Sequence, residues 1–438
     1  MKAFGVSPLL LIPSVWVALA ALVAGLAWAQ SRWTIAPEWS RKSVHVGMGL
    51  VCAVFPWLFT EFWQAAVTVA GASTLLMAVR FVPALQVRFG SVLGGVGRSS
   101  LGDVFFPASV LLLFALAGRE PVFYVVPMLL LALADAAAAL VGTSWGRRSF
   151  TADEGLKTWE GSLAFLGVAF LCIWLPLFLS APEFGARTAV VALCIALVTM
   201  LLEASAWRGL DNLFVPLAAL VMLRVYWSMP VADLLERLAV LAGLFGVFLV
   251  TRRHALMREG TLLGAALAVY LCWVIGGWQW VVAPLTLWLL HPLLIDGGTR
   301  GEDLPVHSHP ALLALALPPL AWLFAAHFTA EPKLFGAFTL ALAAHLAMTA
   351  VALRRTDWQR FGLGRAAGWG GLCGAVICLP FGWLVGEIAA ALAGVLASAL
   401  ALARRQQCSR CARLALVDEC TAAPAAPAGH HRPLRGDE

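Results

Sequence analysis

The chain has 438 residues, of which 61% are hydrophobic and 12% are charged. Soluble domains contain about 25% charged residues, so this chain lacks the polar side chains to cover a water-facing surface of its size, which excludes an ordinary soluble globular protein. The formal net charge of +6 is small, and in a membrane protein the positions of the charges are more informative than their sum.

Long apolar stretches occupy most of the chain. A membrane-spanning helix needs about 20 mainly apolar residues, and Gly, Pro or charged residues separate fifteen candidate stretches. Their approximate spans are 8–29, 45–59, 63–80, 102–117, 121–142, 160–180, 187–205, 211–227, 237–251, 260–276, 278–296, 309–328, 335–353, 368–383 and 384–403. The last two could instead form one re-entrant hairpin. The pattern predicts an all-α, polytopic integral membrane protein with about 14–15 transmembrane helices.

The basic residues are distributed unevenly between the loops. Loops that follow odd-numbered spans, together with the C-terminal tail, contain or border 24 of the 30 Lys and Arg residues. The other six are Lys2, Arg119, Arg187, Arg224, Arg237 and Lys333. By the positive-inside rule, we expect the N-terminus outside and the C-terminus in the cytoplasm. The same distribution favours an uncleaved first span over a signal peptide, because cleavage near Ala29 would invert every later loop.

Ionisable side chains beside membrane spans are costly and therefore indicate function. Arg41 and His45 would share one face of a helix, with Lys42 beside them, and together they could bind an anion at the membrane surface. The alternative is a basic anchor with an interfacial histidine. The glycine-rich segment 90–107 could bind phosphate through backbone N–H groups and a helix that begins near Ser100. Its alternative is a linker with a helix cap.

Asp135 is the most informative of these residues. It lies in the predicted span 121–142, roughly 10 Å from the cytoplasmic end at 1.5 Å per residue. An unpaired carboxylate at that depth is unfavourable, so it needs a cation, a metal ion or a water-filled cleft. Downstream, Lys157 and Glu160 lie at the start of the next span, where a helix N-terminus favours phosphate. A purely structural pair between Asp135 and an arginine is the alternative.

A fourth group adds oxygen ligands at the same predicted membrane face. Glu203 lies near the end of span 187–205, and Asp211 and Asn212 begin the next span. Carboxylate and amide oxygens suit Mg²⁺, a hard cation, although helix capping is the alternative for Asp211 and Asn212. Because all four groups are predicted on the cytoplasmic side, the set contains the parts of a nucleotide-using phosphoryl-transfer site.

Five motifs within residues 40–225 resemble those of the membrane-integral phytol and dolichol kinases, which are related to the CDP-diacylglycerol synthases. They are R-K-S-V-H at 41–45, G-D with a following Pro at 102–107, D-A-A-A-A-L-V-G at 135–142, K-T-W-E-G-S at 157–162 and L-D-N-L-F-V-P at 210–216. The resemblance implies phosphorylation of an isoprenoid alcohol such as phytol or a polyprenol, commonly with CTP as the donor and Mg²⁺ as the cofactor.

The hypothesis assigns roles to the polar residues. Asp135 and Glu160 would hold Mg²⁺ or orient the alcohol. Glu203 and Asp211 would assist as metal ligands, and His45 or Asp135 would take the hydroxyl proton. The nucleotide would contact Arg41, Lys42, Arg147, Arg148, Lys157, Ser162 and Asn212. The expected partners are a lipid alcohol, a nucleoside triphosphate and membrane lipids, with no nucleic acid. We expect the site to face the cytoplasm from a cell inner membrane or an equivalent membrane.

Three regions are expected along the chain. Residues 1–228 would form the kinase-like catalytic domain, and residues 404–438 a disordered cytoplasmic tail. Residues 229–403 would form a second helical membrane domain. It resembles the phytyl-phosphate kinase type in R-E-G-T-L-L-G-A at 258–265, but A-A-H-L-A-M-T at 343–349 lacks the expected acidic residues. We therefore expect this domain to be non-catalytic.

Two other functions remain open. A cytidylyltransferase that forms a CDP-lipid would use the same parts but would attack the α-phosphate of CTP. A transporter would also need ionisable residues in the membrane, although these usually occur at broken helices in paired halves of the chain.

Overall fold

The computed structural model describes residues 7–86, 102–118, 120–152, 155–181, 185–206, 209–252, 258–285, 288, 309–329, 331, 334–339 and 341–342. The chain divides into two compact units. Unit 1 comprises Met1–Val281 and Thr299–Leu312, and unit 2 comprises Val282–Gly298 and Leu313–Glu438. The predicted spans 368–383 and 384–403 and the tail 404–438 lie outside the described residues.

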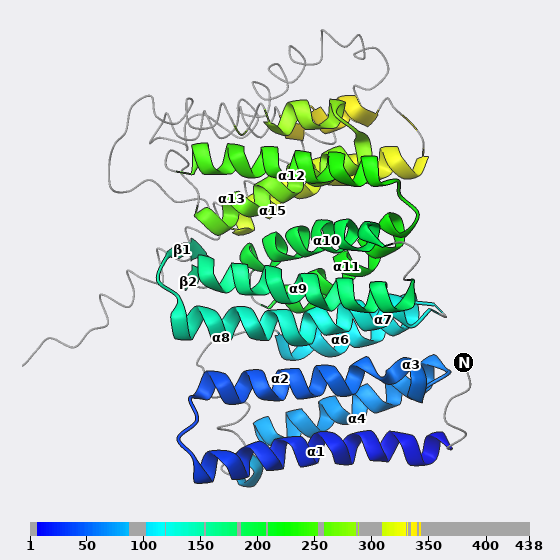
Figure 1. Ribbon diagram of the computed structural model, residues 1–438, viewed down its shortest axis with the longest axis vertical. Coiled ribbons are helices and arrows are strands. Elements are labelled where there is room, and N and C mark those ends of the chain that lie inside the picture. The colour runs from blue at the N-terminus through cyan, green and yellow to red at the C-terminus, as the bar shows by residue number, and fades with distance from the viewer. Residues whose placement is uncertain are drawn as a thin grey trace, which may run out of the picture. The chain divides into compact units, whose positions relative to one another are not determined.

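Unit 1 is a bundle of helices that lie side by side (Figure 1). Its described helices are α1 (Pro8–Arg32), α2 (Pro37–Ala53), α3 (Phe55–Leu58), α4 (Phe62–Phe81), α6 (Gly102–Leu116), α7 (Val122–Leu129), the π-helix η1 (Leu130–Ala134), α8 (Asp135–Trp145), α9 (Trp159–Ser180), α10 (Ala186–Ala204), α11 (Asp211–Trp227), α12 (Val231–Thr251) and α13 (Glu259–Gly276). Helix α15 (His309–Thr329) begins in unit 1 and lies for most of its length in unit 2.

Seven helical segments in the described part of the chain are long and apolar enough to cross a membrane. They are Pro8–Arg32, Phe62–Val79, Val122–Trp145, Trp159–Ser180, Ala186–Ala204, Val231–Thr251 and Glu259–Gly276. The predicted spans 160–180, 187–205 and 260–276 differ from the corresponding helices by no more than one residue at either end. These helices confirm a polytopic α-helical membrane protein.

Helix α2 begins eight residues before the predicted span 45–59. Proline suits the first turn of a helix because it needs no N–H partner there, and Pro37 occupies this position. Glu38 adds a negative charge at the positive end of the helix dipole. As a result, Arg41 and Lys42 lie within the helix, although both precede the predicted span.

The predicted span 121–142 is a helix in three consecutive parts, α7, η1 and α8. Pro127 lies inside α7, where proline removes one backbone donor and disturbs the regular helix. The π-helix η1 follows within three residues, and such wide turns are frequent at functional sites. Asp135 is the first residue after it.

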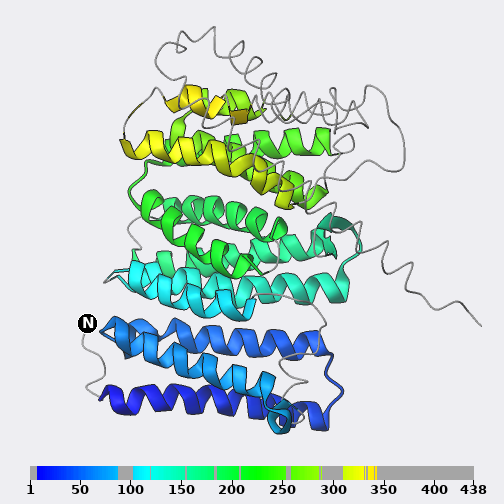
Figure 2. The same cartoon turned by 180° about the vertical axis from the view of Figure 1, so that it is seen from behind.

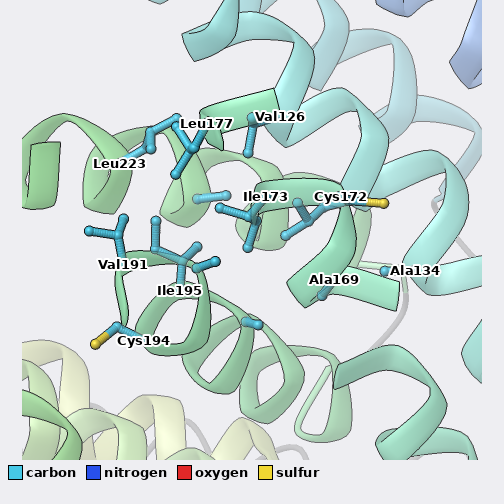
Figure 3. Packing of buried hydrophobic residues seen from close by; sticks show 14 of the residues in the cluster. Val126, Ala134, Ala169, Cys172, Ile173, Leu177, Val191, Cys194, Ile195 and Leu223 are labelled. Atoms are coloured by element: carbon cyan, nitrogen blue, oxygen red, sulfur yellow. The ribbon is translucent and has the colours of Figure 1, made fainter. Parts of the chain in front are cut away.

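Two clusters of buried apolar side chains hold the bundle together. One contains side chains of α7, η1, α8, α9, α10, α11 and α12, including Ala169, Ile173 and Ile195 (Figure 3). The other contains side chains of α1, α2, α3, α4, α6, α7, η1 and α11, including Phe55 and Tyr124. Seen from behind, α1, α2 and α4 again lie next to one another (Figure 2). Helix α7 contributes to both clusters and so connects the two groups of helices.

Glycines allow two close helix crossings. A Cβ at Gly49 would lie 2.4 Å from the Cβ of Ala132, so α2 approaches η1 directly. A Cβ at Gly161 would lie 2.7 Å from the carbonyl oxygen of Ala138, so α9 meets the backbone of α8. Small residues permit such contacts between membrane helices.

The structure also contains a short β-hairpin between α8 and α9, which was not predicted. Strands β1 (Ser149–Ala152) and β2 (Gly155–Thr158) pair antiparallel, with Phe150 opposite Lys157. Phe150 and Ala152 are buried while their neighbours are exposed. Alternation over four residues is too short to indicate a strand from sequence.

The crossing of α8 and α9 gives a first prediction. Gly161→Ala should lower the free energy of unfolding by about 1–3 kcal/mol, because the new methyl group would overlap the Ala138 carbonyl oxygen. The matched control is Gly167→Ala on the same helix, where a Cβ meets nothing within 4 Å. This control should be neutral or stabilising, since alanine favours helix. Thermal unfolding in detergent measures both variants, and equal effects would contradict the crossing.

Candidate active site

A buried ion pair joins α2 to the start of α8. Lys42 Nζ donates a hydrogen bond to Asp135 Oδ2 at 2.6 Å. The Lys42 side chain is 5% exposed and the Asp135 side chain 16%. The carboxylate that the sequence placed inside the membrane is therefore matched by a lysine from another helix.

His45 lies one turn further along α2 and contacts the same carboxylate. Its Nε2 is 3.3 Å from Asp135 Oδ2 and 2.8 Å from the carbonyl oxygen of Leu131 in η1. Because a carbonyl oxygen only accepts hydrogen bonds, Nε2 must carry the hydrogen. The ring also packs edge-on against Phe106 of α6, with the ring centroids 5.1 Å apart. His45 is thus held as a donor beside Asp135, and only Nδ1 could accept a proton.

A second ion pair joins the hairpin to the end of α10. Lys157 Nζ is 2.8 Å from Glu203 Oε1 and also donates to the Glu203 carbonyl oxygen. Burial disfavours the ammonium, but the carboxylates of Glu203 and Asp211 outweigh this effect and raise the pKa of Lys157 above its ordinary value of 10.5. Lys157 therefore carries a positive charge at neutral pH.

Asp211 connects the two ion pairs electrostatically. It is the first residue of α11, and the charges of Asp135, Lys157 and Glu203 all act on its carboxyl group. Among the described residues, no hydrogen bond or ion pair is made by the Asp211 side chain. The residues Lys42, Asp135, Lys157, Glu203 and Asp211, called the charge cluster below, come from α2, α8, β2, α10 and α11.

Asn212 and Ser162 flank this part of the bundle. The hydroxyl of Ser109 in α6 donates to the Asn212 carbonyl oxygen at 2.5 Å, which ties α6 to the first turn of α11. Ser162 is buried in the first turn of α9, next to Gly161.

The base of the hairpin contains another group of the predicted residues. Both oxygens of Glu160 lie 3.2 Å from the backbone N–H of Arg148, and the N–H of Trp159 donates to the Arg148 carbonyl oxygen. The side chains of Arg147 and Arg148 are exposed. The contacts of Glu160 thus close the hairpin and do not connect it to Asp135, Glu203 or Asp211.

Arg41 binds Glu38 of its own helix at 2.6 Å, with 41% of its side chain exposed, and the charges of Asp135 and Asp211 also act on its guanidinium group. Within the described residues, no three His, Cys, Asp or Glu side chains are grouped closely enough to hold a metal ion. Most of the glycine-rich segment, residues 90–101, lies outside the described part of the chain.

The structure identifies the partners of the two lysines of the charge cluster, which the sequence does not reveal. Contact of Lys42 and Lys157 with nucleotide stays a prediction, and the structure adds that each lysine is paired with a carboxylate. The Leu131 carbonyl oxygen and Phe106 were not predicted as parts of the site. The small residues of α2 indicate a close helix approach at Gly49. The π-helix η1 and the contact between the rings of His45 and Phe106 have no recognisable pattern in the sequence.

The described helices form an apolar bundle with a charge cluster of carboxylates and lysines, an arrangement compatible with a membrane-embedded enzyme that transfers phosphoryl groups. No family model and no solved structure matches the chain. A phytol kinase of Synechocystis sp. is 34% identical over 198 residues, which cover 43% of this chain and 80% of the relative. The chain belongs to the phytol kinase family.

The ion pair of Lys42 and Asp135 gives a second prediction. Lys42→Met should lower the free energy of unfolding by about 3–5 kcal/mol, because it leaves a buried carboxylate without its cation. The double variant Lys42→Met with Asp135→Asn should recover most of this loss. Arg41→Met, which removes an exposed pair on the same helix, should change stability by less than about 1 kcal/mol. Additive effects of the two single substitutions in thermal unfolding would contradict a direct pair.

The raised pKa of Lys157 gives a third prediction. Its charge contributes stability fully below the ordinary value of 10.5, and this contribution is lost as the pH rises through the higher folded-state pKa. The difference in unfolding temperature between the wild type and Lys157→Met should therefore be constant from neutral pH to about pH 10 and shrink above it. In a Glu203→Gln background the difference should be smaller throughout. A difference that shrinks near neutral pH would contradict the pairing.

Proposed function

We propose that this protein is an integral-membrane kinase that transfers the γ-phosphoryl group of CTP, or of another nucleoside triphosphate, to an isoprenoid alcohol such as phytol or a polyprenol. The observation that carries the proposal is the charge cluster at one end of an apolar bundle, in a chain of the phytol kinase family. An apolar bundle suits a substrate dissolved in the membrane, and a charge cluster suits a triphosphate.

The proposed cofactor is Mg²⁺, which the carboxylates of the charge cluster would hold only after moving closer together, because no three of them are grouped closely enough for a metal ion in the described part of the chain. Asp135, Glu203 and Asp211 provide only oxygen donors, and the charges of Asp135 and Glu203 both act on Asp211. Mg²⁺ prefers such oxygens and keeps phosphate oxygens in its shell, where it would neutralise charge on the transferring group. Glu160 stays a predicted ligand, although its contacts with Arg148 support a role in holding the hairpin.

The cations around the cluster would bind the triphosphate. Lys42 and Lys157 each pair with a carboxylate, and the charges of both lysines act on Asp211, which supports a role for both in binding the triphosphate. Arg41, Arg147 and Arg148 are exposed near the same end of the bundle. Ser162 and Asn212 are the other proposed nucleotide contacts.

Asp135 is the best placed group to orient the substrate hydroxyl and accept its proton. Its Oδ2 accepts a hydrogen bond from Lys42 and lies 3.3 Å from His45 Nε2, whose hydrogen is donated to the Leu131 carbonyl oxygen. His45 would therefore position Asp135, while Asp135 contacts the alcohol. In kinases, an aspartate commonly has this role.

The proposed orientation follows from the basic residues. Because 24 of the 30 Lys and Arg residues belong to loops on one predicted side and to the tail, the positive-inside rule favours that side as cytoplasmic. The charge cluster would then face the cytoplasm, where nucleotides occur.

A labelled-nucleotide assay tests the function and gives a fourth prediction. With CTP labelled at the γ position, the purified protein should transfer label to phytol or a polyprenol. Asp135→Asn should reduce the rate about 10²- to 10⁴-fold, because the group that accepts the proton is lost. Asp233→Asn, an exposed carboxylate in the first turn of α12, is the matched control and should retain full activity.

Label that appears only in pyrophosphate would support a cytidylyltransferase and contradict the kinase. Near-normal transfer by a folded Asp135→Asn variant would contradict the role of Asp135.

A further inference from the structure

Helix α13 begins directly beside the hairpin that carries Lys157. The backbone N–H of Glu259 donates to Thr151 Oγ1 in β1 at 3.4 Å. Helix α13 packs against β1 and against α10, and helix α12 packs against α10 and α13. From sequence, both helices were placed in the second, non-catalytic domain 229–403, yet they belong to unit 1 together with the charge cluster.

Gly260 is the point of closest contact in this arrangement. A Cβ at Gly260 would lie 3.3 Å from Ala152 Cα, 3.3 Å from the Ala204 carbonyl oxygen and 3.4 Å from Ala152 Cβ. Ala152 ends β1, and Ala204 directly follows Glu203. Gly260 therefore lies between the hairpin that carries Lys157 and the helix end that carries Glu203. Two of the three neighbouring atoms are backbone atoms, which cannot move aside as a flexible side chain can.

Helix α12 holds the other side of the hairpin through aromatic rings. The Trp159 ring centroid is 5.1 Å from that of Phe150 and 6.3 Å from those of Phe245 and Phe248. Phe150 and Phe248 are completely buried. Trp159 follows directly after β2, so packing of its ring restricts the strand that carries Lys157.

The hairpin needs this support for a physical reason. Two strands of four residues each are not stable on their own in water, and within the described part of the chain β1 and β2 pair only with each other. The ion pair of Lys157 and Glu203 spans the gap between the hairpin and α10. A hairpin that moved away from α10 would separate these two charges.

We propose that α12 and α13 are part of the catalytic unit and that Gly260 is a positioning residue, which seats the hairpin against α10 so that Lys157 reaches the charge cluster. This inference rests on the proposed function for its kinetic consequence only. The predicted motif R-E-G-T at 258–261 then supports the first site of the chain and does not belong to a second one.

The test compares two glycine variants of the full-length protein. In Gly260→Leu, the side chain cannot fit between Ala152 and Ala204, so amide hydrogen exchange of residues 149–158 should become at least tenfold faster. The KM for the nucleotide should rise at least tenfold, with a smaller change in kcat. Gly243→Leu on α12 is the control, because a Cβ there meets nothing within 4 Å. It should leave both quantities unchanged.

Gly260→Ala keeps the test decisive if the leucine variant does not fold. Its methyl group requires shifts of only a few tenths of an ångström, so the same two quantities should change about two- to threefold in the same direction. Loss of stability with unchanged hairpin exchange and unchanged KM would overturn the positioning role. Faster hairpin exchange in a protein whose wild type shows no kinase activity would contradict the proposed function and leave the seating of the hairpin supported.

Discussion

A carboxylate inside an apolar helix bundle has to be matched by a positive charge, and the ion pair between Lys42 and Asp135 meets this constraint. Several neighbouring elements position the two charged groups. Helix α2 carries Lys42 and His45 on one face, and the carbonyl oxygen of Leu131 in the π-helix η1 accepts a hydrogen bond that orients the His45 ring. Gly49 lets α2 approach η1 closely enough for these bonds to form. The site therefore depends on a helix crossing as much as on the charges themselves.

The second half of the charge cluster is built differently, because its lysine is on a hairpin and not on a membrane helix. Gly161 holds α9 against α8, Trp159 packs into an aromatic group with Phe150 and Phe248, and Gly260 fits against Ala152. Each contact restrains the short segment that carries Lys157. The motif K-T-W-E-G-S thus combines one residue of the cluster with residues whose main contacts are packing and capping.

Several parts of this arrangement could be predicted from sequence. Asp135 lies within a long apolar stretch, so its need for a partner follows from the cost of an unpaired charge in hydrocarbon. The helix bounds follow from the lengths of the apolar stretches, as the close agreement for α9, α10 and α13 shows. The identity of the partner could not be predicted, because Lys42 is separated from Asp135 by 93 residues and an arginine would meet the same need. The hairpin was missed because its alternation covers only four residues in each strand.

The sequence by itself determined that this is a polytopic membrane protein, which residues are polar where hydrocarbon disfavours them, and which family the motifs resemble. These properties are local, since each depends on hydrophobicity over about 20 residues or on a short run of residue types. Only the tertiary structure decided that Lys42 pairs with Asp135, that Lys157 pairs with Glu203, and that Glu160 closes a hairpin. Which charges meet depends on how closely the helices approach, and glycine contacts between distant segments set that approach.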